Sequence, residues 1–523
     1  MDRRSAWRLS AIAAALLSLA AAARPQQSAV TAEPSISTLS EGRAFLQADD
    51  LDRARASFES VLAGNPSSAE AHYLLGMVLE RQKNLPAAAA AYESAIRYAP
   101  QMAEAYDRLG FVLGQQGKIP DALRHFAQAV HLAPGLFDAQ YHLGATRWWT
   151  RDYAGALPAL EAAVKLRPNH VEARYYLGLT LEGQGRLELA IEHLREAARL
   201  SPQLAVVQKR LGVALQAFGD LDGAIAHLES AVRLDPSAAD AQNSLGLALS
   251  QKGRGDEAVA VFQRLIKAQP AYAPARLNLG TALMQQGNLA EAVAEYRALV
   301  KVDPTNAEAF YNLGLALKQQ DDFAGAEIEL RRAAKLNPEL PEAPFTLGVV
   351  LWQTGRPEEA VLQLRETIAR KPDYADAYYM LGTILKQQGA LVDAVSQFRH
   401  AIRYRPMSAE AHLSLGQALK QLGQEEAAAA ELAEADRLNR KTADAQASTF
   451  AVSIGVQKLK ANDYTGAIER FREAIRLAAE NPQAHYQLAL ALRQTGARAE
   501  ARAHFAEARR LAPHLRPPDD DKR

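Results

Sequence analysis

The side chains best suited to chemistry in this sequence are four histidines at one position of a recurring unit: His125, His193, His227 and His504. Stacked histidines could hold metal ions if neighbouring units supplied matching ligands. Only His193 and His227 lie in adjacent units, and no pattern of carboxylates joins them. We therefore interpret the four as solvated or boundary side chains and predict no metal site.

Other catalytic signatures are missing from the sequence. Cysteine is absent, which excludes disulfides, thiolate nucleophiles and Cys-ligated zinc. There is no glycine-rich phosphate loop, no HExxH motif and no nucleophile elbow. Gly183-Gln184-Gly185 follows an expected helix rather than a strand, which argues against a dinucleotide site. The sequence thus predicts no catalytic residue, no cofactor and a non-enzymatic role; an enzyme in its own right is a weaker hypothesis that any turnover would revive.

Overall charge narrows the class of partner. The chain has 523 residues, with 60 lysines plus arginines balanced by 60 aspartates plus glutamates. A nucleic-acid binder needs clustered basic charge to neutralise phosphates, and this usually appears as a basic excess. We therefore predict no nucleic-acid partner.

The amino terminus has the form of an export signal. Arg3, Arg4 and Arg8 precede an uncharged, alanine-rich stretch at residues 11–23. This order is typical of a cleavable signal peptide, and 13 residues are too few to span a bilayer. We expect residues 1–23 to be removed near Ala23, leaving an exported, periplasmic or secreted chain without a transmembrane segment. The alternative is an alanine-rich helix that belongs to the fold.

A period of 34 residues organises the rest of the chain. Proline recurs with this spacing from Pro66 to Pro406, and glycine recurs from Gly42 to Gly416. An alanine follows each of these glycines by 12 residues, and five extra residues shift the register after Thr442. The predicted segments are a linker at 24–34, twelve repeats at 35–442, an insert or hinge at 443–447, a two-repeat module at 448–515 and a disordered tail at 516–523.

Each unit has the pattern of two helices. In the unit 307–340, apolar residues recur at helical spacing over 307–320 and again over 324–337. Gly314 and Ala326 are small, which suits a close crossing of the two helices. Asp321, or a glycine in most units, stands where a left-handed residue would end the first helix.

The conserved set of each unit resembles the tetratricopeptide repeat, here called TPR. Position 20 is alanine in all fourteen units, and position 8 is glycine in all but the last. Position 4, commonly Trp or Tyr in the family, departs from it at His72, Gln140 and Arg276. The resemblance implies an all-α, right-handed solenoid superhelix of about fourteen helix-turn-helix repeats. In the unit 307–340 the residues that carry it are Leu313, Gly314, Leu317, Ala326, Leu330, Ala333 and Pro338.

The resemblance also implies a concave groove lined by the first helix of each repeat, with positions 2, 5, 9 and 12 on the exposed stripe and position 13 beside it. Its early half is acidic and aromatic, and its late half is basic and rich in amides. The predicted groove residues are Tyr73, Tyr141, Trp148, Trp149, Tyr175, Tyr311, Lys318, Gln319, Phe345, Trp352, Gln353, Tyr379, Lys386, Gln387, Lys420 and Gln421.

This composition favours an extended peptide as the occupant. Aromatic rings offer apolar contact area, and glutamine side chains can bond both the N–H and the C=O groups of a backbone. We expect a scaffold that binds a peptide segment or protein partner in envelope assembly, secretion or complex formation. The alternative is an accessory or glycan-binding subunit of an envelope enzyme complex, whose aromatic residues stack on sugars. For the tyrosines, a simple preference of the repeat for tyrosine at position 5 is an equal alternative.

Overall fold

The computed structural model describes residues 38–515 and 517, and the predicted signal peptide 1–23 and linker 24–34 lie outside them. The predicted tail 516–523 also lies outside, apart from Pro517. None of the helices in the described residues is both long enough and apolar enough to cross a membrane. The helices are α2 (Leu39–Gln47), α3 (Leu51–Gly64), α4 (Ala69–Arg81), α5 (Leu85–Tyr98), α6 (Ala103–Gln115), α7 (Ile119–Leu132), α8 (Phe137–Trp149), α9 (Tyr153–Leu166), α10 (Val171–Gly183), α11 (Leu187–Leu200), α12 (Ala205–Phe218), α13 (Leu221–Leu234), α14 (Ala239–Gln251), α15 (Gly255–Ala268), α16 (Ala273–Gln285), α17 (Leu289–Val302), α18 (Ala307–Gln319), α19 (Phe323–Leu336), α20 (Glu342–Gln353), α21 (Pro357–Arg370), α22 (Ala375–Gln387), α23 (Leu391–Tyr404), α24 (Ala409–Gln421), α25 (Glu425–Lys460), α26 (Tyr464–Leu477), α27 (Pro482–Gln494) and α28 (Arg498–Leu511).

The turn inside each repeat follows from local sequence. The side chain of Asn306 caps α18 by accepting a hydrogen bond from the backbone N–H of Ala309 at 3.0 Å. After the helix, Asp321 has a φ of 61°, and Gly117 at the equivalent place has a φ of 79°. The N–H of Asp322 then bonds the carbonyl of Leu317 at 3.0 Å, which satisfies a free C=O at the helix end. The predicted left-handed ending of the first helix is observed.

Small residues hold the two helices of each repeat close together. A Cβ atom added to Gly314 would lie 2.7 Å from Cγ of Leu330 and 3.3 Å from the carbonyl oxygen of Ala326. Leu330 and Ala326 are fully buried. The predicted close crossing is therefore present, and the expected all-α TPR solenoid is confirmed by the successive packing of helix pairs.

The described helices form two compact units, divided between Val207 and Gln208 inside α12. In the first unit each helix from α2 to α11 packs on the next one, around side chains such as Tyr92, Phe126 and Leu160. In the second unit the same pattern continues from α13 to α28. Each unit is thus a row of helix pairs whose stability comes from neighbouring repeats.

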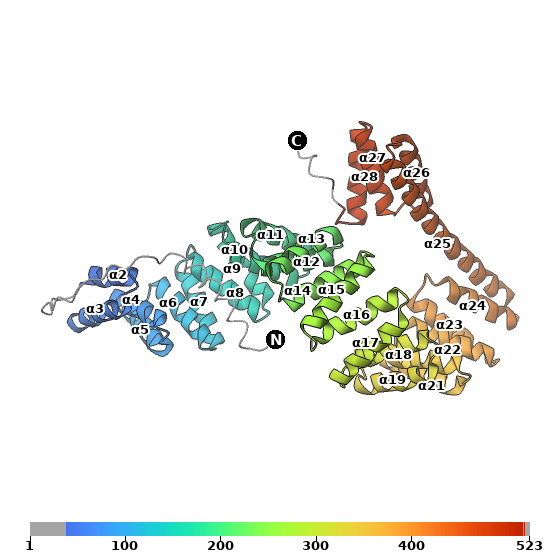
Figure 1. The fold of residues 1–523 in the computed structure, drawn as a ribbon, viewed down its shortest axis with the longest axis horizontal. Helices are drawn as coiled ribbons and strands as arrows, with labels where there is room; N and C mark the ends of the chain where they lie inside the picture. Colours follow the sequence, from blue (N-terminus) through green and yellow to red (C-terminus); the bar gives the residue numbers. More distant parts are fainter. Residues whose placement is uncertain (1–37, 516, 518–523) are drawn as a thin grey trace. The chain divides into compact units, whose positions relative to one another are not determined.

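The longest helix covers the predicted insert or hinge. Helix α25 runs for 36 residues, from Glu425 to Lys460, without a break (Figure 1). Residues 443–447 lie in its middle and are exposed all round, while Leu438 and Ser448 on either side are buried. The five inserted residues are therefore helical in the structure. The separation of a two-repeat module at 448–515 stays a prediction.

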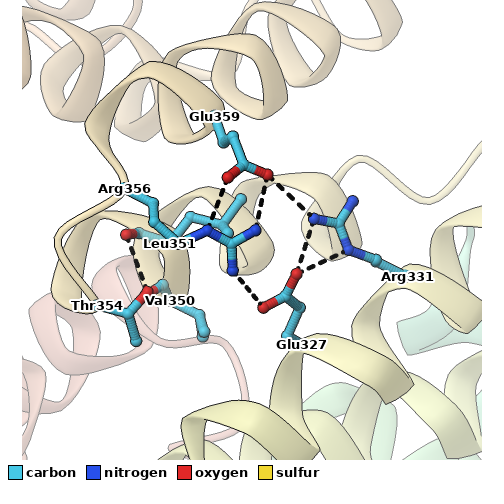
Figure 2. Close-up of polar contacts among 7 residues, drawn as sticks. All are labelled: Glu327, Arg331, Val350, Leu351, Thr354, Arg356 and Glu359. Atoms are coloured by element: carbon cyan, nitrogen blue, oxygen red, sulfur yellow. Dashed lines mark hydrogen bonds and ion pairs between the residues drawn. The ribbon is translucent and has the colours of Figure 1, made fainter.

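A network of four charged side chains joins two consecutive second helices of the second unit (Figure 2). Arg356, just before α21, donates to Glu327 of α19 at 2.7 Å and to both oxygens of Glu359 at 2.7 Å. Arg331 of α19 pairs with Glu327 at 2.8 Å and with Glu359 at 3.6 Å, which closes the network. The paired hydrogen bonds from Arg356 hold the pKa of Glu359 below its usual value. Because its side chains are partly exposed, the network contributes little to the free energy of unfolding. Its hydrogen bonds do connect α19 with the start of α21 in a defined geometry.

Candidate partner-binding face

The first helices of successive repeats lie against one another and form what we call the first-helix face of each unit. In the second unit α14 contacts α16, and the same holds for α20 with α22 and α22 with α24. Side chains at positions 12 and 13 bond across these contacts. Ser250 donates to Gln285 at 2.9 Å, and the indole N–H of Trp352 donates to Gln387 at 3.0 Å.

An aromatic cluster occupies the first-helix face of the first unit. The ring of Trp148 packs edge-on against Tyr176 at 5.1 Å between centroids, and Tyr141 lies 6.1 Å from the same ring. Tyr175 makes an edge contact with Tyr176 at 5.7 Å. Three predicted groove residues are thus brought together by Tyr176, a residue that the sequence reasoning missed. The sequence feature that could have identified Tyr176 is its position directly after Tyr175, one residue away from the predicted stripe.

The two adjacent tryptophans differ in exposure. Trp148 is half-buried against the cluster, whereas 38% of Trp149 is exposed. Burial raises the pKa of the neighbouring Tyr141 hydroxyl well above its usual value. Tyr141 and Trp148 therefore act mainly as packing residues, and Trp149 is the aromatic side chain of this group that is open to a partner.

A partly buried polar network extends from α4 to α8, beside this cluster. The hydroxyl of Tyr92 donates to Glu80 at 2.8 Å, and Arg108 pairs with Glu80 at 3.3 Å. Asp107, nearly fully buried, bonds Nδ1 of His142 at 2.8 Å. The charge of Glu80 in the predicted acidic half is therefore engaged by an arginine of the protein itself.

The aromatic residues at position 5 pack on neighbouring helices in both units. Tyr73 lies 5.8 Å from Tyr92, Tyr379 lies 5.9 Å from Phe398, and Phe345 lies 5.1 Å from Tyr374. Burial raises the pKa of Tyr311, the remaining one. All four are half-buried, so each contributes an edge of its ring to the first-helix face while its other side stabilises the repeat.

The polar groove residues of the second unit lie on α18, α20, α22 and α24. Lys386 donates to Gln417 at 2.7 Å, and Trp352 is held by Gln387 as described above. Lys318 is half-buried. The fully exposed members of this set are Gln319, Gln353, Gln387, Lys420 and Gln421.

Three of the four histidines at the shared repeat position make contacts within the protein, whereas the buried Nδ1 atom of His193 has no hydrogen-bond partner among the described residues. In the described part of the chain, no three His, Cys, Asp or Glu side chains gather closely enough to hold a metal ion. His227 bonds Gln208 at 2.8 Å, and His504 bonds His485 at 2.9 Å between the two Nδ1 atoms. His125 packs against Tyr106 with 5.9 Å between ring centroids.

Family comparison places repeats along most of the chain. One model, described as the tetratricopeptide repeat, matches residues 39–103, 146–205, 209–273, 345–402 and 454–515. A model described as the TPR repeat matches residues 280–321 and 382–423. Further tetratricopeptide repeat models match residues 102–133, 307–340 and 409–442.

Three solved structures each align with about a third of the chain or slightly more. The crystal structure of MamA is 30% identical, covering 32% of this chain and 97% of its own, with a TM-score of 0.30. YrrB, titled a TPR protein with an unusual peptide-binding site, is 25% identical over 35% of this chain and 95% of its own, with a TM-score of 0.34. The pilF protein of Pseudomonas aeruginosa is 21% identical over 39% and 93%, with a TM-score of 0.36. No protein with curated annotation matches the sequence.

Proposed function

This chain belongs to the tetratricopeptide repeat family, and we propose that it is a non-enzymatic scaffold whose first-helix face binds a peptide segment or protein partner. The family is generally one of protein-interaction scaffolds, and the models that match the chain are all of this repeat. The proposal places the partner against the face where successive first helices meet.

One observation carries the assignment to this face. Trp149 of the first helix α8 keeps 38% of its surface exposed, whereas the preceding residue, Trp148, packs against Tyr176. An exposed tryptophan has the features of an interface anchor, because it offers a large apolar area at low cost in side-chain entropy.

A pull-down from envelope extract tests the proposal. The full-length protein is compared with a Trp148→Ala/Trp149→Ala/Trp352→Ala variant, and we expect the variant to lose its protein partners. The matched control is Ile328→Ala/Leu362→Ala/Val392→Ala, which removes three exposed apolar side chains from the second helices α19, α21 and α23. An unchanged set of partners in the tryptophan variant contradicts the proposal. Binding of glycans without proteins supports the alternative, a glycan-binding subunit of an envelope enzyme complex.

We further propose that the protein works outside the cytoplasm, in envelope assembly, secretion or complex formation. Arg3, Arg4 and Arg8 followed by the uncharged stretch 11–23 support export. Mass spectrometry of the protein purified from its natural host should find a mature amino terminus near Arg24. A protein that retains Met1 in the cytoplasmic fraction contradicts this part of the proposal.

A further inference from the structure

Position 12 of four consecutive first helices in the second unit carries Lys318, Trp352, Lys386 and Lys420, which we call the lysine–tryptophan strip. Resting on the proposed function, we infer that this strip binds an acidic peptide segment in the polyproline II conformation. The segment would present acidic, apolar, acidic and acidic side chains at every third residue.

The positive charge of the strip is not neutralised by the protein. Among the described residues, Lys318 and Lys420 take part in no ion pair, and Lys386 bonds only the neutral amide of Gln417. The acidic residues of the same helices stand at position 2, ten residues before position 12. Ten helical residues span about 15 Å, beyond the reach of a direct contact. A ligand with carboxylates therefore finds cations here that have no competing partner.

The position-2 carboxylate of α22 is paired within the protein. Asp376, at position 2 of α22, accepts two hydrogen bonds from Arg405 at 2.6 and 2.7 Å. This bidentate pair neutralises the carboxylate that shares a helix with Lys386.

Trp352 interrupts the lysines and is fixed in place. Its indole N–H donates to Gln387 of the next repeat at 3.0 Å, and its ring is half-buried. Because the polar edge of the ring is satisfied, the exposed part of Trp352 offers mainly apolar surface. The ligand side chain opposite it should therefore be apolar rather than charged.

The spacing of the strip selects the conformation of the ligand. Packed helices lie about 8–10 Å apart, and each helix contributes one strip residue. A polyproline II segment rises about 3.1 Å per residue with three residues per turn, so every third side chain returns to the same face after about 9.3 Å. A β-strand alternates faces every residue, so its third residue would point away from the strip.

The glutamines beside the strip suit such a backbone. Gln319, Gln353 and Gln421 follow the strip residues at position 13 and are exposed. A polyproline II segment leaves its N–H and C=O groups without internal hydrogen bonds. Glutamine amides can bond both kinds of group, so they complement the charge and apolar contacts made by the strip.

Fluorescence anisotropy with labelled, proline-rich peptides tests the inference on the full chain. The first peptide carries acidic, apolar, acidic and acidic residues at intervals of three, and the second has the same composition at intervals of two. We expect the first to bind at least about tenfold more tightly, with an affinity that falls as salt rises. A third peptide with lysines in place of the acidic residues should not bind.

Substitutions locate the binding. Lys386→Gln/Lys420→Gln should weaken the first peptide by about tenfold or more. The matched control is Lys301→Gln/Lys335→Gln, which removes two exposed lysines from the ends of the second helices α17 and α19 and should leave the affinity unchanged. Circular dichroism is used to check that each variant is folded. This check is needed because the lysines of the strip lie in the last turn of their helices, where a positive charge stabilises the helix.

Three outcomes would overturn the inference: equal binding of the two acidic peptides, no binding of either, or equal binding of a single-stranded oligonucleotide of the same charge. Any of them is distinguishable from failure of the proposed function. If the pull-down with the Trp148→Ala/Trp149→Ala/Trp352→Ala variant still recovers fewer envelope proteins than the wild type, the first-helix face binds a partner of different chemistry. If they are retained, the proposed function fails as well.

Discussion

At the scale of single residues, the glycine at position 8, present in every repeat but the last, sets how closely the two helices approach. A Cβ added to Gly280 would lie 2.6 Å from Cε1 and Cζ of Tyr296, whose side chain is fully buried. Gly280→Ala should therefore displace the tyrosine and reduce the free energy of unfolding by about 1–3 kcal/mol. Urea denaturation measures the loss.

The control for this substitution is Gly64→Ala. Gly64 ends α3, and an added Cβ there meets no atom within 4 Å. We expect a change of at most about 1 kcal/mol, in the stabilising direction, because alanine is the better helix former. Equal losses in the two variants would show that the crossing does not depend on glycine.

His504 should make the carboxyl-terminal repeats sensitive to acid. Burial, and next the charge of His485, lower the pKa of His504, although Glu500 and Glu507 oppose this and Arg472 adds to it. The unfolded chain then binds more protons than the folded chain below pH about 6.5. The stability of the folded chain is therefore complete above about pH 6.5 and falls as the pH drops from there through the lowered pKa of His504 in the folded chain.

Urea unfolding of the full chain at pH 7.5 and pH 5.0 checks this pH dependence. The wild type should lose more stability on acidification than His504→Gln, which cannot be protonated. His131→Gln, at an exposed histidine, is the control and should behave as the wild type does. Equal losses in the wild type and His504→Gln would rule out a contribution from the histidine pair.

The repeat register and the family resemblance predicted the helices that carry the candidate site but not the role of each side chain. The 34-residue register placed Tyr73 and Tyr379 on the correct helices, yet both pack on aromatic residues of the second helices, Tyr92 and Phe398. The pairing of Trp352 with Gln387 joins residues 35 apart and depends on how two repeats stack. Such contacts are set by tertiary packing, which a repeat pattern does not specify.

At the scale of elements, α25 is one continuous helix at a place where other repeats have a turn, and the inserted residues 443–447 lie in its middle. Spin labels at Asp436→Cys and Ser453→Cys can measure its straightness, because the chain has no native cysteine and both positions are exposed. Seventeen helical residues span about 26 Å, and we expect a narrow distance distribution near that value by electron resonance. Adding Ala445→Pro should broaden it, because proline removes a helix hydrogen bond and clashes with the preceding turn.

A broad distribution without the proline would instead identify residues 443–447 as a hinge. The sequence left both forms open, because a five-residue shift of register has no unique structural solution. Residues 443–447 are all exposed, so burial of their side chains does not favour a helix over a turn. Only the helical propensity of the flanking repeats favours continuity, and propensity is a weak determinant.

At the scale of the whole molecule, we expect that a single 34-residue repeat can be deleted without unfolding the rest of the array. Deleting residues 239–272, one complete period, keeps the order of first and second helices. Because repeats are stabilised by their neighbours, we expect a cooperative thermal transition and an unchanged helical content per residue by circular dichroism. Deleting only 239–255 leaves a second helix without its first, and this variant should lose helicity. Equal behaviour of the two deletions would contradict a modular solenoid.

The central claim is that the first-helix face binds a protein or peptide partner, and photo-crosslinking tests it most directly. A benzoylphenylalanine is placed at Gln353, exposed beside Trp352, and in a matched protein at Leu362, 62% exposed on the second helix α21. Irradiation in native envelopes should yield crosslinked partners from position 353 and none from position 362. Partners captured only from position 362, or from neither position, would contradict the account.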